Sequence, residues 1–298
     1  MSRSEPPVER TLFGDVPAAE RVVNVASVPH RSPFRYPGGK TWLVPRVRDW
    51  LQSLPRPSVL VEPFAGGAIV GVTAAFEGLA ERVVLVELDA DVAAAWQAIF
   101  GDDNEWLARR ILAFELTEDN VRAEIASAPA TTRERAFRIL LKNRVNHGGI
   151  LAPGATLLRT GENGKGLRSR WYAGTLARRI RELRTVRDKV EVVCGDGIAV
   201  IERHSGESKA VFFIDPPYTA AGKRAGRRLY SHHELDHEAL FAATARVKGD
   251  FLMTYDNAEA VAEMAARHGF ATRAVPMKNT HHAVMSELLV GRNLGWVR

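Results

Sequence analysis

The chain has 298 residues, of which 46% are hydrophobic, and carries a formal net charge of +6. This size and composition predict a globular protein built as one large domain or as one domain with an insertion. The single cysteine, Cys194, excludes an internal disulfide and a cysteine-based zinc cage. No apolar stretch reaches the length of a membrane span, and the N-terminus lacks the apolar core of a secretory signal, so we expect a cytoplasmic protein.

The positive charge is concentrated in one segment. Residues 131–190 carry 15 Lys and Arg against 4 Asp and Glu, whereas the remainder of the chain carries 26 against 31. Basic segments of this kind usually face phosphate groups, and a solvated helix face is the alternative. The distribution of charge therefore favours a nucleic acid as partner.

The first regular elements follow an irregular N-terminal segment. Residues 1–31 mix Pro, Glu, Arg and Val without sustained periodicity, and we expect a flexible tail there. Two short apolar runs, 58–64 and 82–88, are each followed by a helical pattern, at 68–79 and 89–100. The order is strand, helix, strand, helix.

The same alternation returns in the last third of the chain. Strands are predicted at 190–193, 210–214 and 250–255, and helices at 197–204, 237–247 and 257–269. The final runs, 270–277 and 283–291, have no helix between them, which indicates an antiparallel pair. Together these elements predict an α/β, Rossmann-like fold with a mostly parallel sheet covered on both faces, and ligands at the carboxyl ends of its strands.

Residues 102–188 interrupt the alternation. They contain helical patterns and a glycine-rich stretch from Asn146 to Gly166. We therefore expect an insertion between two halves of one sheet, with 32–101 and 189–298 forming a single domain.

Two neighbouring strand ends carry the pattern of a nucleotide site. The run VEPFAGG places Phe64, Gly66 and Gly67 in a turn directly after the first strand, where glycine permits close approach of a ligand to the backbone. Glu87 closes the second strand and can accept hydrogen bonds from ribose hydroxyls, or it can cap the helix that begins near Asp89. The G-x-G-x-x-G dinucleotide pattern is absent, which weakens a nicotinamide or flavin interpretation.

Ahead of the first strand, RYPGGK contributes an aromatic residue, Tyr36, and a lysine, Lys40. The phosphate-binding pattern G-x-x-x-x-G-K-[ST] is not met, so an ATPase is not indicated.

The run VFFIDPPY ends an apolar strand in an acid and two prolines. Asp215 and the carbonyl of Pro216 can both accept hydrogen bonds from an exocyclic amine, while Pro217 keeps the backbone extended and Tyr218 offers a face for stacking a base. Two acceptors draw the amine hydrogens out of the ring plane and free the nitrogen lone pair for attack. We predict that these four residues form the catalytic site.

The motifs RYPGGK, VEPFAGG, VLVELDAD, VVCGDG, FFIDPPY and LMTYDN, in this order, resemble those of the alpha-class, Dam-like N6-adenine DNA methyltransferases. The resemblance extends from about Phe34 to Val290. It implies S-adenosylmethionine as cofactor, a flipped target adenine in double-stranded DNA, and a target-recognition role for residues 102–188.

The resemblance also implies which residues bind the cofactor. They are Tyr36, Lys40, Phe64, Gly66, Gly67, Glu87, Asp196 and Asp215. Two positions depart from the family pattern, since tryptophan is common in place of Tyr36 and aspartate in place of Glu87; both replacements keep the aromatic or charged character. Asp196 follows another strand and can equally be a helix cap.

Basic and amide side chains are the candidates for DNA contact. Within the insertion they are Lys142, Arg144, Asn146, Arg168 and Arg170, and after the catalytic loop they are Lys223, Arg224, Arg227 and Arg228. Arginine and asparagine can read guanine and adenine edges, and the sequence does not separate such base contacts from phosphate contacts.

Several alternatives stay open at this point. Cytosine-N4 methylation would use the same acceptor pair, and a relative without catalytic activity would keep only the DNA contacts. Cys194 lacks the preceding proline expected for a cytosine-C5 nucleophile, and the paired histidines favour surface roles, so no metal site is expected. The oligomeric state and a cognate restriction endonuclease as partner are not determined by the sequence.

Overall fold

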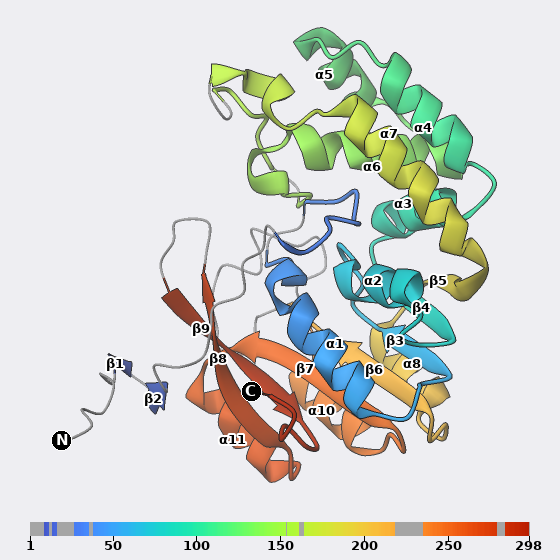
Figure 1. The fold of residues 1–298 in the computed structure, drawn as a ribbon. Coiled ribbons are helices and arrows are strands. Elements are labelled where there is room, and N and C mark those ends of the chain that lie inside the picture. Colours follow the sequence, from blue (N-terminus) through green and yellow to red (C-terminus); the bar gives the residue numbers. More distant parts are fainter. Residues whose placement is uncertain are drawn as a thin grey trace, which may run out of the picture.

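The computed structural model describes residues 9–11, 14–16, 27–35, 38–152, 154–160, 164–217, 235–278 and 284–297. Its central feature is a sheet with the strand order β5-β4-β3-β6-β7-β9-β8 (Figure 1). The strands are β3 (Val59–Glu62), β4 (Arg82–Glu87), β5 (Val190–Cys194), β6 (Ala210–Ile214), β7 (Asp250–Asp256), β8 (Ala271–Lys278) and β9 (Val284–Gly291). All neighbours pair in parallel except β9, which is antiparallel to both β7 and β8. The predicted α/β class, the mostly parallel sheet and the antiparallel end of the chain are thus confirmed.

Helices cover both faces of this sheet. They are α1 (Val44–Ser53), α2 (Ile69–Glu77), α3 (Ala90–Phe100), α8 (Gly197–His204), α10 (His237–Ala245) and α11 (Glu259–Arg267). One hydrophobic cluster joins α1, α2 and α3 to the sheet, and a second joins α8, α10 and α11. Five of these helices coincide with helical patterns in the sequence, and α1 does not.

Strand residues divide between the two clusters with a period of two. In β3, Leu60 belongs to the first cluster, whereas Val59 and Val61 belong to the second. Successive side chains of a strand point to opposite faces, and here both faces are packed. This explains why the strands read as continuous apolar runs rather than as alternating ones.

Helices α4 (Asn104–Ala113), α5 (Glu118–Ala126), α6 (Thr132–Val145) and α7 (Ala173–Leu183) lie between α3 and β5 in the chain. In Figure 1 they gather above the sheet as a green-to-yellow group. Their buried residues continue the first hydrophobic cluster, so this group packs onto the sheet domain through a shared core. The boundaries of the insertion, 102 and 188, stay a prediction.

Part of the predicted tail is described. It contains the short antiparallel pair β1 (Glu9–Thr11) and β2 (Gly14–Val16), and residues 27–31. Val28 is 3% exposed and belongs to the first hydrophobic cluster. The packed part of the chain therefore begins before residue 32.

Candidate functional site

The candidate site lies at the carboxyl ends of the parallel strands, where the strand order reverses. From β3 the chain moves outward to β4 and β5, and then returns to place β6 on the other side of β3. Glu62 is the last residue of β3, and Asp215 follows the last residue of β6. Such a reversal opens a crevice above the strand ends, which is the usual ligand position in sheets of this kind.

Lys40 joins two carboxylates at this edge. Its Nζ lies 2.9 Å from Asp215 Oδ1 and 3.0 Å from Glu287 Oε1, and it donates to the carbonyl oxygen of Gly38 at 2.9 Å. Burial alone would lower the pKa of Lys40, but the two carboxylates raise it above its ordinary value, so the ammonium stays charged. The side chains of Lys40 and Glu287 are 3% and 4% exposed, whereas that of Asp215 is 24% exposed. Asp215 is therefore the member of this cluster that a substrate can reach.

Strand β7 provides a second support for Asp215. The hydroxyl of Thr254 donates to Asp215 Oδ1 at 2.8 Å. The next residue, Tyr255, is bonded through its hydroxyl to Nδ1 of His237 at 2.9 Å. Burial, and to a smaller extent the charge of Asp215, raises the pKa of Tyr255, so its hydroxyl stays protonated.

Glu62 lies beneath the same edge. Its Oε2 accepts a hydrogen bond of 2.7 Å from the backbone N–H of Gly71, in the first turn of α2. Burial and the nearby charge of Asp215 raise the pKa of Glu62 to about 8, although the bond from Gly71 lowers it. Residue Ala68, which precedes α2, has no side chain that can cap the helix. Glu62, at the end of β3, instead accepts one of the backbone N–H groups at the start of the helix.

Two hydrogen bonds hold the glycine turn after β3. The N–H of Gly66 donates to Glu87 Oε2 at 2.9 Å, and the indole N–H of Trp96 donates to the carbonyl of Gly66 at 2.9 Å. Gly66 has a φ of 45°, and Ala68 has a φ of 46°, which is unusual for a residue with a Cβ atom. The turn is thus held in a tightly specified conformation.

Glu87 does not cap the following helix. Its Oε1 accepts from the N–H of Asp89 at 2.9 Å, and Asp89 itself caps α3 by accepting from the N–H groups of Asp91 and Val92. Burial raises the pKa of Glu87 to about 7, against the opposing effect of the N–H groups of Asp89 and Gly66. The next residue, Leu88, is apolar and 51% exposed.

These strand ends fit the cofactor that the resemblance implies. Gly66 and Gly67 are partly exposed, so the backbone of the turn is open to close approach by a ligand. Glu87 offers a carboxylate of the kind that accepts bonds from ribose hydroxyls, and the exposed Leu88 offers an apolar surface for a planar ring. Phe64, partly buried, lies in the same turn. The roles of these residues in binding stay predictions.

Asp196 lies one strand further out. It caps α8, because its Oδ1 accepts from the N–H groups of Ile198 and Ala199 at 2.7 and 3.3 Å. The N–H of the preceding Gly195 donates to the backbone carbonyl of Glu87 at 3.0 Å. The helix-cap alternative is thus present in the structure, and the position beside Glu87 is compatible with the cofactor role.

Two residues near the end of α6, Asn143 and Arg144, connect the insertion to the segment before Lys40, and a third, Asn146, bonds within the insertion. Asn143, which the sequence analysis did not select, accepts from the N–H of Arg35 at 2.8 Å and donates to the carbonyls of Arg35 and Gly149 at 2.9 Å each. Arg144 donates to the carbonyl of Pro33, and Asn146 donates to the carbonyl of Ile150 at 2.8 Å. Arg144 and Asn146 are 4% and 6% exposed. Each donates to a backbone carbonyl here, and a direct contact of either residue with DNA stays a prediction.

Arg144 lies within a group of like charges. Burial and the neighbouring Arg179, Arg35 and Arg170 lower the pKa of Arg144 to about 9. Burial, Arg179 and Arg35 also lower the pKa of His30. Arg35 and His30 are exposed, and Arg170 and Arg179 are partly exposed. The junction thus brings several guanidinium groups close together, an arrangement that suits an anionic ligand.

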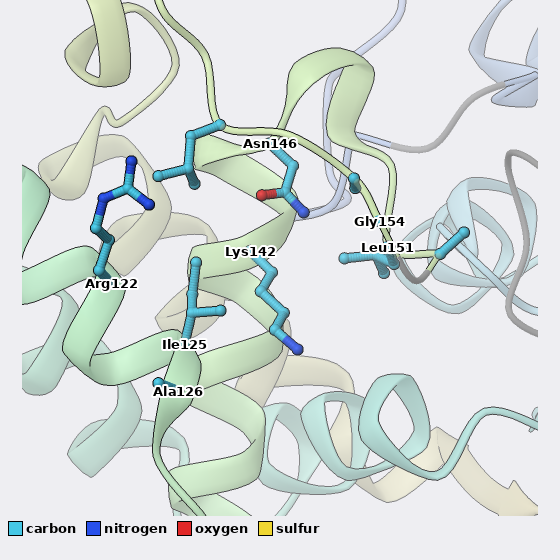
Figure 2. A pocket seen from close by; sticks show the side chains of 10 residues that line it. Arg122, Ile125, Ala126, Lys142, Asn146, Leu151 and Gly154 are labelled. Atoms are coloured by element: carbon cyan, nitrogen blue, oxygen red, sulfur yellow. The ribbon is translucent and has the colours of Figure 1, made fainter.

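Lys142 lines a separate pocket of about 650 Å³ inside the insertion. The pocket is bounded by α5, the end of α6 and the loop that follows it, with Arg122, Lys142 and Asn146 among apolar side chains (Figure 2). Arg122 also pairs with Glu118 on the surface of α5. Arg168 is exposed, on the 3-10 helix Gly166–Ser169.

Several predicted site residues lie outside the described part of the chain. They are Tyr36, Tyr218, Lys223, Arg224, Arg227 and Arg228. Of the DPPY motif, the described residues are Asp215, Pro216, which is buried, and Pro217, which is partly exposed.

The described part of the chain contains neither a membrane-spanning helix nor a cluster of metal ligands. None of the helices found there combines the length and the apolar character needed to cross a membrane. In the same part of the chain, His, Cys, Asp and Glu side chains nowhere gather in a group of three that could hold a metal ion.

A family model described as D12 class N6 adenine-specific DNA methyltransferase matches residues 36–275. No curated relative matches the sequence. Among solved structures, a SAM-dependent methyltransferase from Agrobacterium tumefaciens has a TM-score of 0.40 at 11% identity. The match covers 85% of this chain and 60% of that chain, so a large part of that protein has no counterpart here. A precorrin-6y C5,15-methyltransferase from Geobacter metallireducens has a TM-score of 0.38 at 12% identity, covering 87% and 91%. A methyltransferase from Geobacter sulfurreducens has a TM-score of 0.33 at 14% identity, covering 83% and 76%. TM-scores this low carry no inference about function.

Proposed function

The chain belongs to the D12 class of N6 adenine-specific DNA methyltransferases, as its motifs predicted, and from this premise we propose that it methylates adenine N6 at a specific DNA sequence, on a base flipped out of the duplex. The family uses S-adenosylmethionine, and the chain is a methyltransferase with that cofactor. Asp215, Pro216, Pro217 and Tyr218 form the proposed catalytic site.

One observation carries the placement of the chemistry at Asp215. Among the three linked charges Lys40, Asp215 and Glu287, only Asp215 is appreciably exposed, and it lies at the strand-order reversal beside Glu62. Lys40 and Thr254 both bond to its Oδ1 and fix the direction of the carboxylate. A carboxylate held in this way is a preorganised acceptor for a substrate N–H group.

The proposed mechanism uses acceptors rather than a covalent enzyme intermediate. S-adenosylmethionine supplies an electrophilic methyl group on a sulfonium. Asp215 and the carbonyl of Pro216 accept the two N6 hydrogens, which turns the nitrogen lone pair out of the ring plane and toward the methyl carbon. The bound cofactor would supply the methyl group to N6, and its C–S bond would break with the electron pair on sulfur as the N–C bond forms. The surplus N6 proton passes to the Asp215 carboxylate and from there to solvent.

We further propose that residues 102–188 hold the DNA. The positive junction of Arg35, Arg170 and Arg179 supports phosphate contact at the border between the insertion and the sheet domain. The exposed Arg168, and Lys142 with Arg122 in the pocket of Figure 2, supply further cations on the insertion. Lys223, Arg224, Arg227 and Arg228 stay proposed contacts beside the flipped base.

The direct experiment is methylation of unmodified double-stranded DNA by the purified protein with methyl-labelled cofactor, followed by nucleoside analysis. We expect label in N6-methyladenine at one short sequence. Label in N4-methylcytosine would replace the adenine assignment by the cytosine alternative.

Asp215→Ala tests the assigned site. We expect methylation to be abolished while DNA affinity is largely kept, because the affinity depends on Lys and Arg contacts and falls with added salt. Asp49→Asn, an exposed carboxylate on α1, is the matched control and should methylate as the wild type does. Normal methylation by Asp215→Ala would refute the mechanism, and DNA binding by a wild type that transfers no methyl group would indicate a relative without catalytic activity.

A further inference from the structure

The glycine turn after β3 has a middle peptide that can take two orientations. Its four residues, 65–68, form a β-turn, because the N–H of Ala68 donates to the carbonyl of Ala65. Gly66 has a φ of 45°, whereas Gly67 is not among the glycines with positive φ. These signs are those of a type II′ turn, and in a type I′ turn the peptide between the two glycines is rotated so that its carbonyl and N–H point the opposite way. Glycine adopts either sign of φ readily, so the two glycines by themselves leave both orientations accessible.

The indole of Trp96 selects one of these orientations. Its Nε1–H donates to the carbonyl of Gly66 at 2.9 Å, and the side chain of Trp96 is 0% exposed, so this carbonyl points toward the interior. The described part of the chain has no cis peptide bond. In a trans peptide the carbonyl and the following N–H point in opposite directions, so the N–H of Gly67 points away from the interior. Within the described residues no protein group accepts a hydrogen bond from it.

Two aromatic rings fix the indole in turn. The ring centroid of Phe34 lies 5.3 Å from that of Trp96, and the ring of Phe100 stacks on the indole at 5.8 Å and 18°. A buried indole N–H needs an acceptor, and many carbonyls could serve. Here the acceptor belongs to the one peptide group of the turn that has two accessible orientations. The bond therefore determines what the turn presents to the crevice above the strand ends.

The conformation selected in this way carries strain. Ala68, the last residue of the turn, has a φ of 46°, in the left-handed region that residues with a Cβ atom seldom adopt. Strain of this kind persists where surrounding contacts impose it, and it gathers at functional sites. At this turn the imposing contacts are those from Trp96 and Glu87 to Gly66.

We propose that Trp96 is a positioning residue for the cofactor. By holding the carbonyl of Gly66 inward, its indole turns the N–H of Gly67 outward as a donor to the carboxylate of S-adenosylmethionine. The inference rests on the proposed placement of the cofactor at this turn. In the rotated orientation the carbonyl oxygen of Gly66 would face the ligand, and an oxygen acceptor cannot bind a carboxylate. Trp96 acts through the turn and does not touch the cofactor.

The test measures binding without DNA. Titration calorimetry gives the Kd of S-adenosylmethionine and of its decarboxylated form, which keeps the sulfonium and the ammonium and lacks only the carboxylate. In Trp96→Phe, which keeps an aromatic ring and removes the N–H, we expect S-adenosylmethionine to bind about tenfold more weakly, with little change for the decarboxylated form. An equal loss for both ligands, or no loss for either, would overturn the inference.

Trp50→Phe is the matched control. Trp50 lies in α1, is 1% exposed and donates through its indole N–H to Asp250 Oδ2 at 3.1 Å. The control thus removes a buried indole and its hydrogen bond away from the turn, and both Kd values should stay as in the wild type. A control that lost affinity for S-adenosylmethionine alone, as Trp96→Phe is expected to do, would contradict a specific role of Trp96.

Hydrogen exchange of the wild type tests the same geometry should Trp96→Phe not fold. The amide of Gly67 should exchange rapidly in the free protein, because it has no acceptor there. Saturating S-adenosylmethionine should slow its exchange, and the decarboxylated form should not. A Gly67 amide already protected in the free protein, or protected equally by the two ligands, would refute the proposed orientation of the peptide.

The outcome is independent of the proposed DNA chemistry. A selective loss of S-adenosylmethionine affinity in Trp96→Phe, in a protein that fails to methylate adenine, would support the role of Trp96 and refute the proposed function. Adenine methylation by a protein in which Trp96→Phe binds both ligands as the wild type does would do the reverse.

Discussion

Gly71→Ala tests whether the contact between β3 and α2 is as close as the structure shows. A Cβ atom at this position would come within 2.5 Å of Glu62 Oε2, 2.6 Å of a Leu85 methyl group and 3.0 Å of a Val83 methyl group. The backbone of Gly71 lies within α2 and is not among the residues with positive φ. Any loss of stability therefore reports packing and not backbone strain.

The expected size follows from two opposing effects. Alanine in place of glycine inside a helix stabilises by about 0.5–1 kcal/mol. Inserting a methyl group into a packed interior costs about 1–3 kcal/mol, and here Glu62 must move away from the N–H of Gly71, which weakens a buried hydrogen bond of about 1 kcal/mol. We expect a net destabilisation of about 1–3 kcal/mol, together with weaker cofactor binding because the glycine turn precedes this helix.

Urea denaturation of the wild type and the variant gives the free energy of unfolding. The matched control is Gly174→Ala in α7, where no atom lies within 4 Å of the added Cβ. That control should be neutral or stabilised by up to about 1 kcal/mol. If Gly71→Ala proved as stable as Gly174→Ala relative to the wild type, the close packing of Glu62 beneath the site would be wrong.

The remaining predictions concern buried polar groups. Glu62 keeps its proton up to about pH 8 when folded, against an ordinary value of 4.5, so between these values only the unfolded chain loses the proton and stability falls as pH rises. In Glu62→Gln this dependence of stability on pH should vanish. Between pH 5 and 8 the unfolding free energy of the variant should therefore rise relative to that of the wild type by up to about 1.4 kcal/mol per pH unit. Parallel curves of stability against pH for the two proteins would refute the raised pKa. Asn143→Ala leaves backbone groups of Arg35 and Gly149 without their hydrogen-bond partner, so urea denaturation should show a loss of about 2–4 kcal/mol in unfolding free energy. The control Asn120→Ala, whose side chain is exposed, should lose less than about 1 kcal/mol. Equal losses in the two variants would contradict the structural role of the Asn143 hydrogen bonds.

Most of the fold could be read from the sequence because apolar strands and periodic helices are local signals. The seven strands of the sheet correspond to seven predicted runs to within two residues at each end. Helix α1 was not predicted. It begins at Val44-Pro45, directly after a 3-10 turn that starts at Lys40. The glycines before that turn are typical of a ligand-binding loop, so the sequence did not indicate a helix there.

The site was only partly accessible to sequence reasoning. Asp215 and Lys40 were selected from motifs, but their contact joins segments far apart in the chain, and no local pattern encodes it. Glu287 left one signal, a single acid within the apolar run of β9, where a buried charge requires a partner. Arg144 and Asn146 were selected for charge and polarity, which say nothing of burial. In the structure both are buried and bond to backbone carbonyls, Arg144 to that of Pro33 before the insertion and Asn146 to that of Ile150 within it.

The departures from ordinary folding rules gather at one place. Ala68, in the left-handed region, is the one non-glycine residue with positive φ in the described part of the chain, and it lies in the turn after Glu62. Lys40 and Glu287 form an almost completely buried ion pair, and Lys40 also bonds to Asp215. Replacing a buried ion pair by apolar side chains is often neutral or stabilising, so stability alone gives no reason to keep these charges. Their position at the strand-order reversal gives such a reason, because Lys40 fixes the carboxylate of Asp215, the exposed member of the group, at the edge where sheets of this kind bind ligands.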